Sequence, residues 1–509
     1  MRNRFLSLSV VLLGIALLAG FALAQGKGSS EPAVEKLQPV LTLDNQGPSP
    51  SRPQLLVQVR APLDKYKLDT LSRYGTIDLV IERYRLVAII PKGPSATRTL
   101  RSLPFVERAE EDQPRWLADT ASWDRDILDV VDVEESGIIG TPDPREVTET
   151  GAGVHVAVID TGLIQRWRDF LPVGQVRTDL ARAFMGGGAI LGLDNFSEPT
   201  NMWERDTNSH GTAVASHIIG FKIAPRVMDG VAPDAMVIPL KVFPNGQAFT
   251  FTSRITAAIA HTTQLKANGV IGSTVISMSI GGGSPSNFER LAIQDAISNG
   301  IIFVVAAGNG GENGMSWPGA FPEVISAGAT GWVEQFLPTP PAAGGAFWRT
   351  RDVGNDPDGS GTSEELQSFV TTFSSRAIPQ LGIDRGTDPQ ELDVLAPGAA
   401  TVAPCLLPGV GLGNATFCFW FGTSFSTPLT AGVAALMLEK NSSLTQADVE
   451  SIMKATALTM AGVDGRAVPV PVATTNPTLW DTTCGPSALA CDPVGAGLLQ
   501  ADAALAAVP

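Results

Sequence analysis

Short runs rich in Val and Ile alternate with longer helical segments through much of this sequence. The runs include VHVAVI, AMVIPLKVF, STVISMS and GIIFVVAAG, and the segments between them include SHGTAVASHIIG and NFERLAIQDAISN. Continuous apolar strands separated by helices predict an α/β fold with a mostly parallel, doubly wound sheet and helices on both faces. Ligands bind such sheets beyond the carboxyl ends of the strands, so we expect the chemistry there.

The composition is that of a globular protein with a strong acidic excess. The chain has 509 residues, of which 44% are apolar and 17% are charged, so it can bury a large core. It carries 36 basic and 51 acidic residues, a formal net charge of −15. This charge repels polyanions, which argues against nucleic acid and anionic membrane surfaces as partners.

The amino-terminal residues predict export. Arg2 and Arg4 precede an apolar run that ends in the tripeptide Ala-Leu-Ala at 22–24, an order typical of a secretory signal peptide over 1–24. A retained membrane anchor is the alternative. No later stretch reaches the roughly 20 apolar residues that span a bilayer. We therefore expect a secreted protein, extracellular or periplasmic, with no stable membrane anchor and with a polar linker over 25–52.

Two further units are predicted after the linker. Residues 53–115 show the order β-α-β-β-α, closed by the segment VERAEED, which predicts a small α+β unit of the split βαβ type. The main α/β domain is expected over 120–509. Within it, residues 331–372 are rich in Pro, Gly and acidic side chains, which predicts a surface insertion.

The four cysteines lie late in the chain. Their spacing suits two local disulfides, Cys405–Cys418 and Cys484–Cys491, and an oxidising compartment would preserve them. Four reduced thiols are the alternative.

Four polar residues stand at predicted ends of strands and helices. Asp160 ends the run VAVID, Asn309 ends IIFVVAAGN, His210 begins a helical segment, and Ser424 precedes the helical pattern TPLTAGVAALMLEK. Taken singly, each has an ordinary structural interpretation as a cap, a buried histidine or a turn residue. Together they supply the acid, base, nucleophile and oxyanion donor that acyl transfer needs.

These residues stand in motifs that resemble a known family. VIDTG, HGTAVA, AAGN and GTSFSTP occur in that order, and residues from about 150 to 506 resemble the catalytic domain of a subtilisin-like (subtilase) serine peptidase. Further matches are GVAPDAMVIPLKV at 230–242, SMSIGGG at 277–283, DVLAPG at 393–398 and GAGLLQADAA at 495–504. The chain has neither HExxH nor G-x-S-x-G, the markers of zinc peptidases and α/β-hydrolases.

The resemblance implies a serine endopeptidase that acts on proteins or peptides. Ser424 would attack the scissile carbonyl, His210 would transfer the proton, Asp160 would orient His210, and Asn309 would hold the oxyanion. Ala213 and Leu429 stand where the family often has histidines, and neither belongs to the triad.

The substrate cleft is also implied by the resemblance. Ser279, Ile280, Gly281 and Gly282 would form one wall, and residues 245–252 would form the other edge, so that an extended substrate adds as a strand. Gly310 rather than an acidic residue comes directly after Asn309, so we expect an apolar or broad preference for the side chain before the cleaved bond.

The small unit at 53–115 resembles the inhibitor propeptide of these enzymes, with a retained accessory domain as the alternative. The predicted function is thus a secreted, self-inhibited, monomeric serine endopeptidase that needs no cofactor for its chemistry. Structural calcium is a candidate in acidic loops such as 352–361, but the sequence assigns no metal ligands. The rival functions are a catalytically silent subtilase-fold binding protein and an esterase that uses the same triad.

Overall fold

The protein is described here from a computed structural model. The structure describes residues 54–112, 114–117, 128, 130, 145, 147–184, 201–223, 226–332, 368–406, 415–458, 483–484 and 489–509. The predicted signal peptide, the linker and the acidic loop at 352–361 lie outside these ranges.

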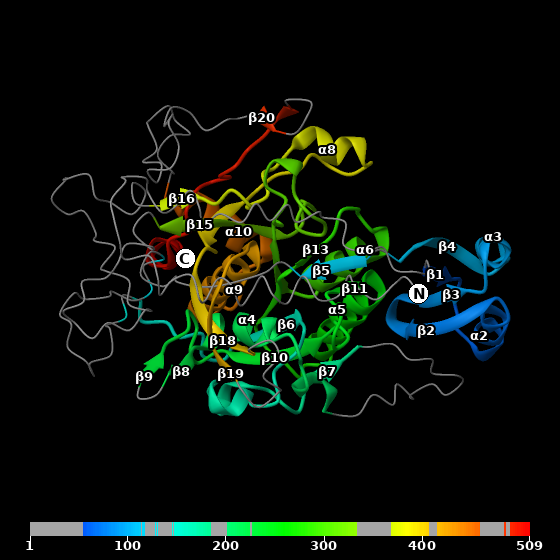
Figure 1. Cartoon of the computed structure of the whole chain (residues 1–509), viewed down its shortest axis with the longest axis horizontal. Coiled ribbons are helices and arrows are strands. Elements are labelled where there is room, and N and C mark those ends of the chain that lie inside the picture. The colour runs from blue at the N-terminus through cyan, green and yellow to red at the C-terminus, as the bar shows by residue number, and fades with distance from the viewer. Residues whose placement is uncertain are drawn as a thin grey trace, which may run out of the picture. The chain divides into compact units, whose positions relative to one another are not determined.

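The main domain is built on an eight-stranded sheet (Figure 1). Its strand order is β16-β15-β14-β12-β6-β10-β7, with β17 also paired to β15. Only β16 runs antiparallel to its neighbour, which confirms the predicted mostly parallel sheet. The strands are β6 His155–Asp160, β7 Arg182–Ala183, β10 Met236–Lys241, β12 Thr274–Met278, β14 Ile301–Ala306, β15 Ile325–Trp332, β16 Ser368–Val370 and β17 Val394–Pro397.

Strand β6 lies between β10 and β12 and is buried on both faces. Its first residue, His155, pairs with Met236 on one side and Thr274 on the other. Because side chains alternate along a strand, Val156 and Val158 enter one apolar cluster, whereas Ala157 and Ile159 enter the other.

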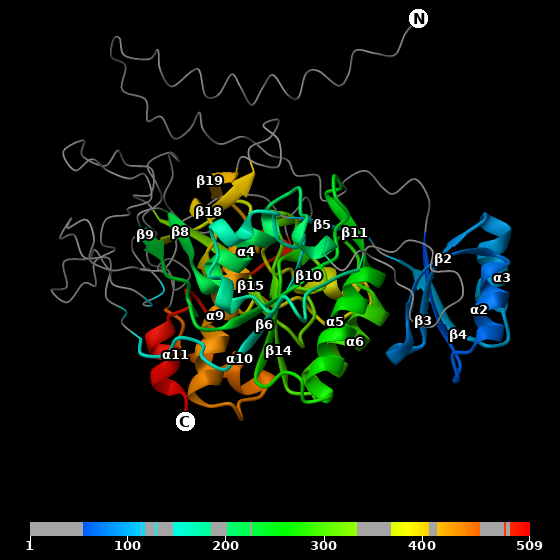
Figure 2. The same cartoon turned by 90° about the horizontal axis from the view of Figure 1, so that it is seen from below.

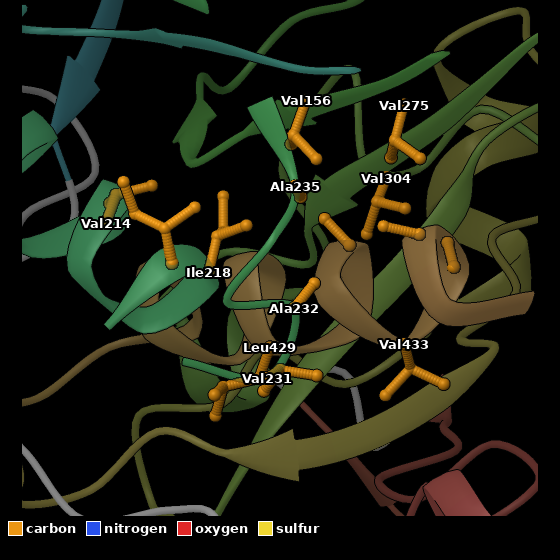
Figure 3. Close-up of a cluster of buried hydrophobic side chains, with 14 of the residues drawn as sticks. Val156, Val214, Ile218, Val231, Ala232, Ala235, Val275, Val304, Leu429 and Val433 are labelled. Carbon is orange, nitrogen blue, oxygen red and sulfur yellow. The ribbon is translucent and has the colours of Figure 1, made fainter. Parts of the chain in front are cut away.

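Helices cover both faces of this sheet. Figure 2 shows α4 (His210–Ile219) and α9 (Thr423–Lys440) on one side of the strands, and α5 (Thr252–Ala267) and α6 (Asn287–Ser298) on the other. Figure 3 shows the first of these layers, where side chains of α4 and α9 meet valines from the strands. The labelled members include Val156, Val275 and Val304 from the sheet and Val214, Ile218, Leu429 and Val433 from the helices.

The remaining elements, which include β5 before the predicted start of the main domain, are short. They are β5 Pro114–Leu117, β8 Phe221–Ile223, β9 Arg226–Met228, β11 Phe249–Phe251, β13 Ile280–Gly281, α8 Pro379–Asp384, β18 Thr401–Leu406, β19 Ala415–Trp420, α10 Gln446–Thr456, β20 Thr483–Cys484, β21 Leu489–Ala490 and α11 Ala501–Ala507, with 3-10 turns at Trp167–Asp169, Val173–Gln175, Met202–Glu204 and Gly311–Asn313.

The predicted α+β unit has its own antiparallel sheet in the order β2-β3-β1-β4. Its elements are β1 Leu55–Val59, α2 Lys65–Ser72, β2 Gly75–Ile81, a 3-10 turn at Glu82–Tyr84, β3 Leu86–Pro91, α3 Pro94–Ser102 and β4 Val106–Glu111. Figure 2 shows α2 and α3 on one face of this sheet, where Leu71 and Leu100 pack against Val57 and Ile89. This arrangement confirms the predicted β-α-β-β-α-β order.

Two other sequence predictions have mixed outcomes. The first disulfide, Cys405–Cys418, is formed and joins β18 to β19. Cys491 is also disulfide-bonded, but the side chain of Cys484 lies outside the described part, so that pairing stays a prediction. The boundaries of the predicted insertion at 331–372 are wrong, because its two ends belong to β15 and β16, whose pairing extends the edge of the sheet. Its middle lies outside the described residues.

Candidate active site

The carboxylate of Asp160 and the imidazole of His210 are directly bonded. Asp160 is the last residue of β6, and His210 is the first residue of α4. His210 Nδ1 lies 2.8 Å from Asp160 Oδ1 and 3.0 Å from Oδ2, and both side chains are fully buried. The backbone N–H of Thr161 donates to Asp160 Oδ1 at 2.6 Å, which fixes the carboxylate opposite the ring.

A glycine allows this close approach between α4 and the end of β6. A Cβ on Gly211 would lie 2.4 Å from the carbonyl oxygen of Gly162 and 3.1 Å from Asp160 Oδ1. The preceding residue, Ser209, adopts φ +76°, a left-handed conformation that is uncommon for residues other than glycine. The entry to α4 is therefore a strained turn that must be held by its surroundings.

Asp206 holds that turn. Its carboxylate accepts hydrogen bonds from the backbone N–H groups of Asn208 at 2.9 Å and Ser209 at 2.7 Å, and from Thr161 Oγ1 at 2.8 Å. Lys241 Nζ lies 3.6 Å from Asp206 Oδ1, and both residues are buried. Burial raises the pKa of Asp206 above its ordinary value, while the charge of Lys241 opposes that shift.

The sequence analysis missed this network. Two signals were available: Asp206 stands four residues before His210, and Lys241 ends an otherwise apolar strand. Charged residues inside the core need partners, so a lysine at that position is itself an indication of a buried ion pair.

Ser424 and Asn309 lie together at the beginning of α9. Ser424 is the second residue of that helix and is fully buried. The neighbouring Thr423 donates to Asn309 Oδ1 through its backbone N–H at 2.9 Å and through its hydroxyl at 3.1 Å. Asn309 therefore has its amide oxygen held by the residue before Ser424.

The amide nitrogen of Asn309 has no such partner. Asn309 Nδ2 is buried, and no hydrogen-bond acceptor reaches it among the residues that the structure describes. A buried donor without an acceptor costs free energy, about 1–3 kcal/mol. Its position beside the amino end of α9, where the N–H groups and the helix dipole favour negative charge, suits an oxygen anion.

The imidazole of His210 lies against the first turn of α9, because α4 packs against α9. The His210 ring lies 5.3 Å, centroid to centroid, from the ring of Phe425, the residue after Ser424. Trp420, at the end of the disulfide-linked hairpin, lies 6.0 Å from the same imidazole. Leu406 of that hairpin donates its N–H to Ser209 Oγ at 3.1 Å, so the hairpin contacts the turn before His210 as well.

The other hydroxyls near Ser424 are occupied by backbone carbonyls. Ser426 Oγ donates to Ala396, Thr427 Oγ1 to Thr423, and Thr430 Oγ1 to Ser426. These bonds give the three side chains structural roles.

A short strand lies between the two predicted walls of the cleft. Strand β5 pairs antiparallel with β13 on one side, where Leu117 is opposite Ile280, and with β11 on the other, where Trp116 is opposite Phe249. Each wall thus pairs its backbone with an extended segment. Gly281 permits a close neighbour, since a Cβ there would lie 2.6 Å from the Cβ of Ser316.

The remaining histidines do not form a metal site. The ring nitrogens of His217 contact the carbonyl of Ala213 at 2.8 Å and Thr401 Oγ1 at 2.6 Å, which is a structural arrangement. His155 contacts Arg177, and burial lowers the pKa of His261 to about 4. Among the described residues, no group of three His, Cys, Asp or Glu side chains has a geometry that would hold a metal ion.

The fold and the bonded pair of Asp160 and His210 define a class: α/β proteins with an acid and an imidazole at the carboxyl edge of a parallel sheet. Comparison with known proteins identifies the family. The sequence profile of the subtilase family, a family of peptidases, matches residues 151–482, so the chain belongs to that family.

Individual relatives agree with this assignment. The chain is 29% identical over 315 residues to subtilisin amylosacchariticus of Bacillus subtilis subsp. amylosacchariticus, which covers 60% of this chain and 61% of that protein. It is 26% identical over 395 residues to alkaline elastase YaB of a Bacillus species, with 77% and 80% covered. The chain thus spans about three fifths of the length of the subtilisins it matches.

A solved structure shares the fold. Fervidolysin of Fervidobacterium pennivorans, a keratinolytic enzyme related to subtilisin, superposes with a TM-score of 0.59 at 19% identity, over 90% of this chain and 62% of that one.

The first prediction concerns the buried pair Asp206 and Lys241. Asp206→Asn removes the carboxylate from a buried lysine, and we expect it to lower the free energy of unfolding by about 3–5 kcal/mol. Combining it with Lys241→Met should lower it by less than the sum of the two single changes. Denaturant titration of the three variants measures this coupling. Strictly additive effects would show that the two side chains do not depend on each other.

Proposed function

We propose that this protein is a serine endopeptidase in which Ser424 is the nucleophile, His210 the general base and acid, Asp160 the orienting acid, and Asn309 the oxyanion donor. The family assignment supports hydrolysis of peptide bonds. The observation that carries the residue assignment is the pair of features around Ser424: an imidazole bonded to a buried carboxylate, and a buried amide donor with no acceptor in the described structure.

The proposed chemistry follows from these positions. Ser424 Oγ attacks the scissile carbonyl carbon while its proton passes to His210 Nε2, and the electron pair of the C=O bond moves to oxygen. Asn309 Nδ2 and the N–H of Ser424 then donate to that oxygen anion. Collapse of the intermediate expels the amine, which takes the proton from His210. This leaves an acyl ester on Ser424. Water attacks that ester and gives a proton to His210, the ester C–O bond then breaks to release the acid, and Ser424 Oγ takes the proton back. Asp160 stabilises the imidazolium each time it forms.

A probe for serine hydrolases tests this assignment. We expect a fluorophosphonate to label the mature protein at Ser424, and Ser424→Ala to abolish labelling because the attacking oxygen is gone. Ser426→Ala is the matched control: its hydroxyl binds the Ala396 carbonyl, so labelling should persist. Asn309→Ala should lower kcat on a peptide substrate by about 10²–10³, the effect of losing such a donor in a subtilisin. A folded mature protein that resists the probe would favour the silent binding protein.

We also propose that the chain is made as a precursor that its own amino-terminal unit inhibits. Three contacts support this. Strand β5 occupies the cleft between β11 and β13. Glu110 accepts hydrogen bonds from Ser286 Oγ and from the N–H of Phe288 at the start of α6. Asp112 Oδ1 accepts from the N–H of Ser253 at the start of α5, at 2.7 Å.

The other face of the small sheet adds to this contact. Leu56, Leu86 and Ala88 share one apolar cluster with α5 and α6. At the edge, Arg83 and Tyr84 both bond to Asp295, at 2.6 and 2.7 Å. Carboxylates at two helix amino ends and a shared apolar cluster are features of a specific interface.

Cleavage should fall after the strand that lies in the cleft. Because β5 is antiparallel to β13, it points from Ile280 toward Ser279, whose carbonyl oxygen lies 3.4 Å from Ser424 Oγ. From the sequence we expect a cut between about Asp112 and Trp123, and the position of β5 in the cleft narrows this expectation to a mature protein that begins between residues 118 and 123. Intact-mass and amino-terminal analysis of the exported product measures this. A mature chain that retains Pro114–Leu117 would contradict the proposed inhibition.

The contact at Asp112 should depend on pH. Burial raises the pKa of this carboxyl to about 7 from an ordinary value near 3.8. Its contribution to stability is therefore fully present below about pH 4 and is lost as the pH rises through 7. In the Ser424→Ala precursor, the melting temperature of Asp112→Asn should be near that of its parent at pH 4 and higher than that of its parent at pH 8. A difference in melting temperature that does not change with pH would show that Asp112 titrates normally.

Further parts of the proposal follow from the family. Substrates are proteins or peptides, the unit over 53–115 is the inhibitor, and the protein acts as an exported monomer. No helix within the described ranges is long and apolar enough to span a membrane. The chemistry above uses side chains and one backbone N–H of this chain together with water, and calcium, if bound, would have a structural role.

A further inference from the structure

We propose that the hydroxyl of Ser279 positions the nucleophile, by binding the backbone carbonyl of Ser424 that Pro428 leaves without a helical donor. This inference rests on the proposed function and gives Ser279 a positioning role beside its predicted place in the cleft wall.

The need for this bond comes from the proline. In an α-helix the N–H of residue i donates to the carbonyl of residue i−4, so the donor for Ser424 would be residue 428. Proline has no N–H, and its ring pushes against the carbonyl of residue i−4. Pro428 is the sixth residue of α9, inside the helix rather than among its first free N–H groups.

Ser279 supplies the missing donor from the neighbouring strand. It follows β12 directly, is fully buried, and its Oγ donates to the Ser424 carbonyl at 2.7 Å. In return, Ser424 Oγ donates to the Ser279 carbonyl in a longer bond of 3.4 Å. Two bonds of opposite direction thus join the backbone and side chain of one serine to those of the other.

The position of this pair explains why it matters for reaction. The first turn of α9 carries both the attacking oxygen and the N–H proposed to hold the oxyanion. A carbonyl displaced by the proline ring, with nothing to bind it, would let that turn tilt. Displacements of about 1 Å at reacting groups can cost on the order of 10² in rate.

Double substitution tests the inference, because replacing the proline restores the missing N–H. Ser279→Ala should lower kcat and the rate of fluorophosphonate labelling by about tenfold or more, with KM for a short peptide changed by less than about twofold. Adding Pro428→Ala should recover most of the labelling rate. Ser277→Ala is the matched control: it is a buried serine in β12 whose hydroxyl has no partner among the described residues, so labelling should match the parent.

Two outcomes would overturn the inference: Ser279→Ala labelled as fast as its parent, or a slow Ser279→Ala that Pro428→Ala does not improve. A parent protein that resists the probe would instead count against the proposed function. The bond is then tested in the Ser424→Ala precursor, which keeps the backbone carbonyl. There Ser279→Ala should lower the melting temperature and Pro428→Ala should restore it, and the absence of that recovery would refute the bond.

Discussion

The parallel pairing of β6 with β10 and β12 is the constraint on which the site depends. Parallel strands end at the same edge of a sheet, so the residues at and beyond the ends of β6 and β14 are neighbours although they are far apart in sequence. Asp160 and Asn309 follow from that rule. The helices that begin at the same edge, α4 and α9, add His210 and Ser424. The strand pairing thus positions Asp160 and Asn309 directly, and it positions His210 and Ser424 through the helices that begin at the same edge.

Burying so many polar groups costs free energy unless each has a hydrogen-bond or charge partner. Near the site, Asp206 has several such partners, whereas the amide nitrogen of Asn309 has none among the described residues. Asp206 is surrounded by donors from Thr161, Asn208 and Ser209, and Lys241 balances its charge. Asn309 keeps one donor unbound. The satisfied groups keep the backbone rigid, whereas the unsatisfied one suits an anion that forms only during reaction. A donor that is held in place before the charge develops is what preorganisation requires at the proposed oxyanion site.

The sequence predicts the layers, and it yields four candidate catalytic residues, because both depend on local patterns. Val/Ile runs mark β6, β12 and β14, and each candidate residue stands at the end of such a run or at the start of a helix. It does not predict the ion pair of Asp206 and Lys241 or the bond from Ser279 to Ser424, because these join residues that are 35 and 145 positions apart. The predicted boundaries of the insertion at 331–372 are wrong for a similar reason. Strand β16 is only three residues long, and its pairing with β15, not its composition, makes it a strand.

The pairing of β5 with β11 and β13 gives a physical reason for the proposed inhibition. Strands β11 and β13 both offer backbone groups to a strand between them, and β5 uses both. Without an occupant, these edges would expose unpaired N–H and C=O groups, the feature that makes edge strands bind other chains. A substrate that adds as a strand must use the same groups as β5. Strand β5 and a substrate would therefore compete for one set of hydrogen bonds. A cleft that is open enough to accept any peptide backbone can also be filled by this strand of the same chain.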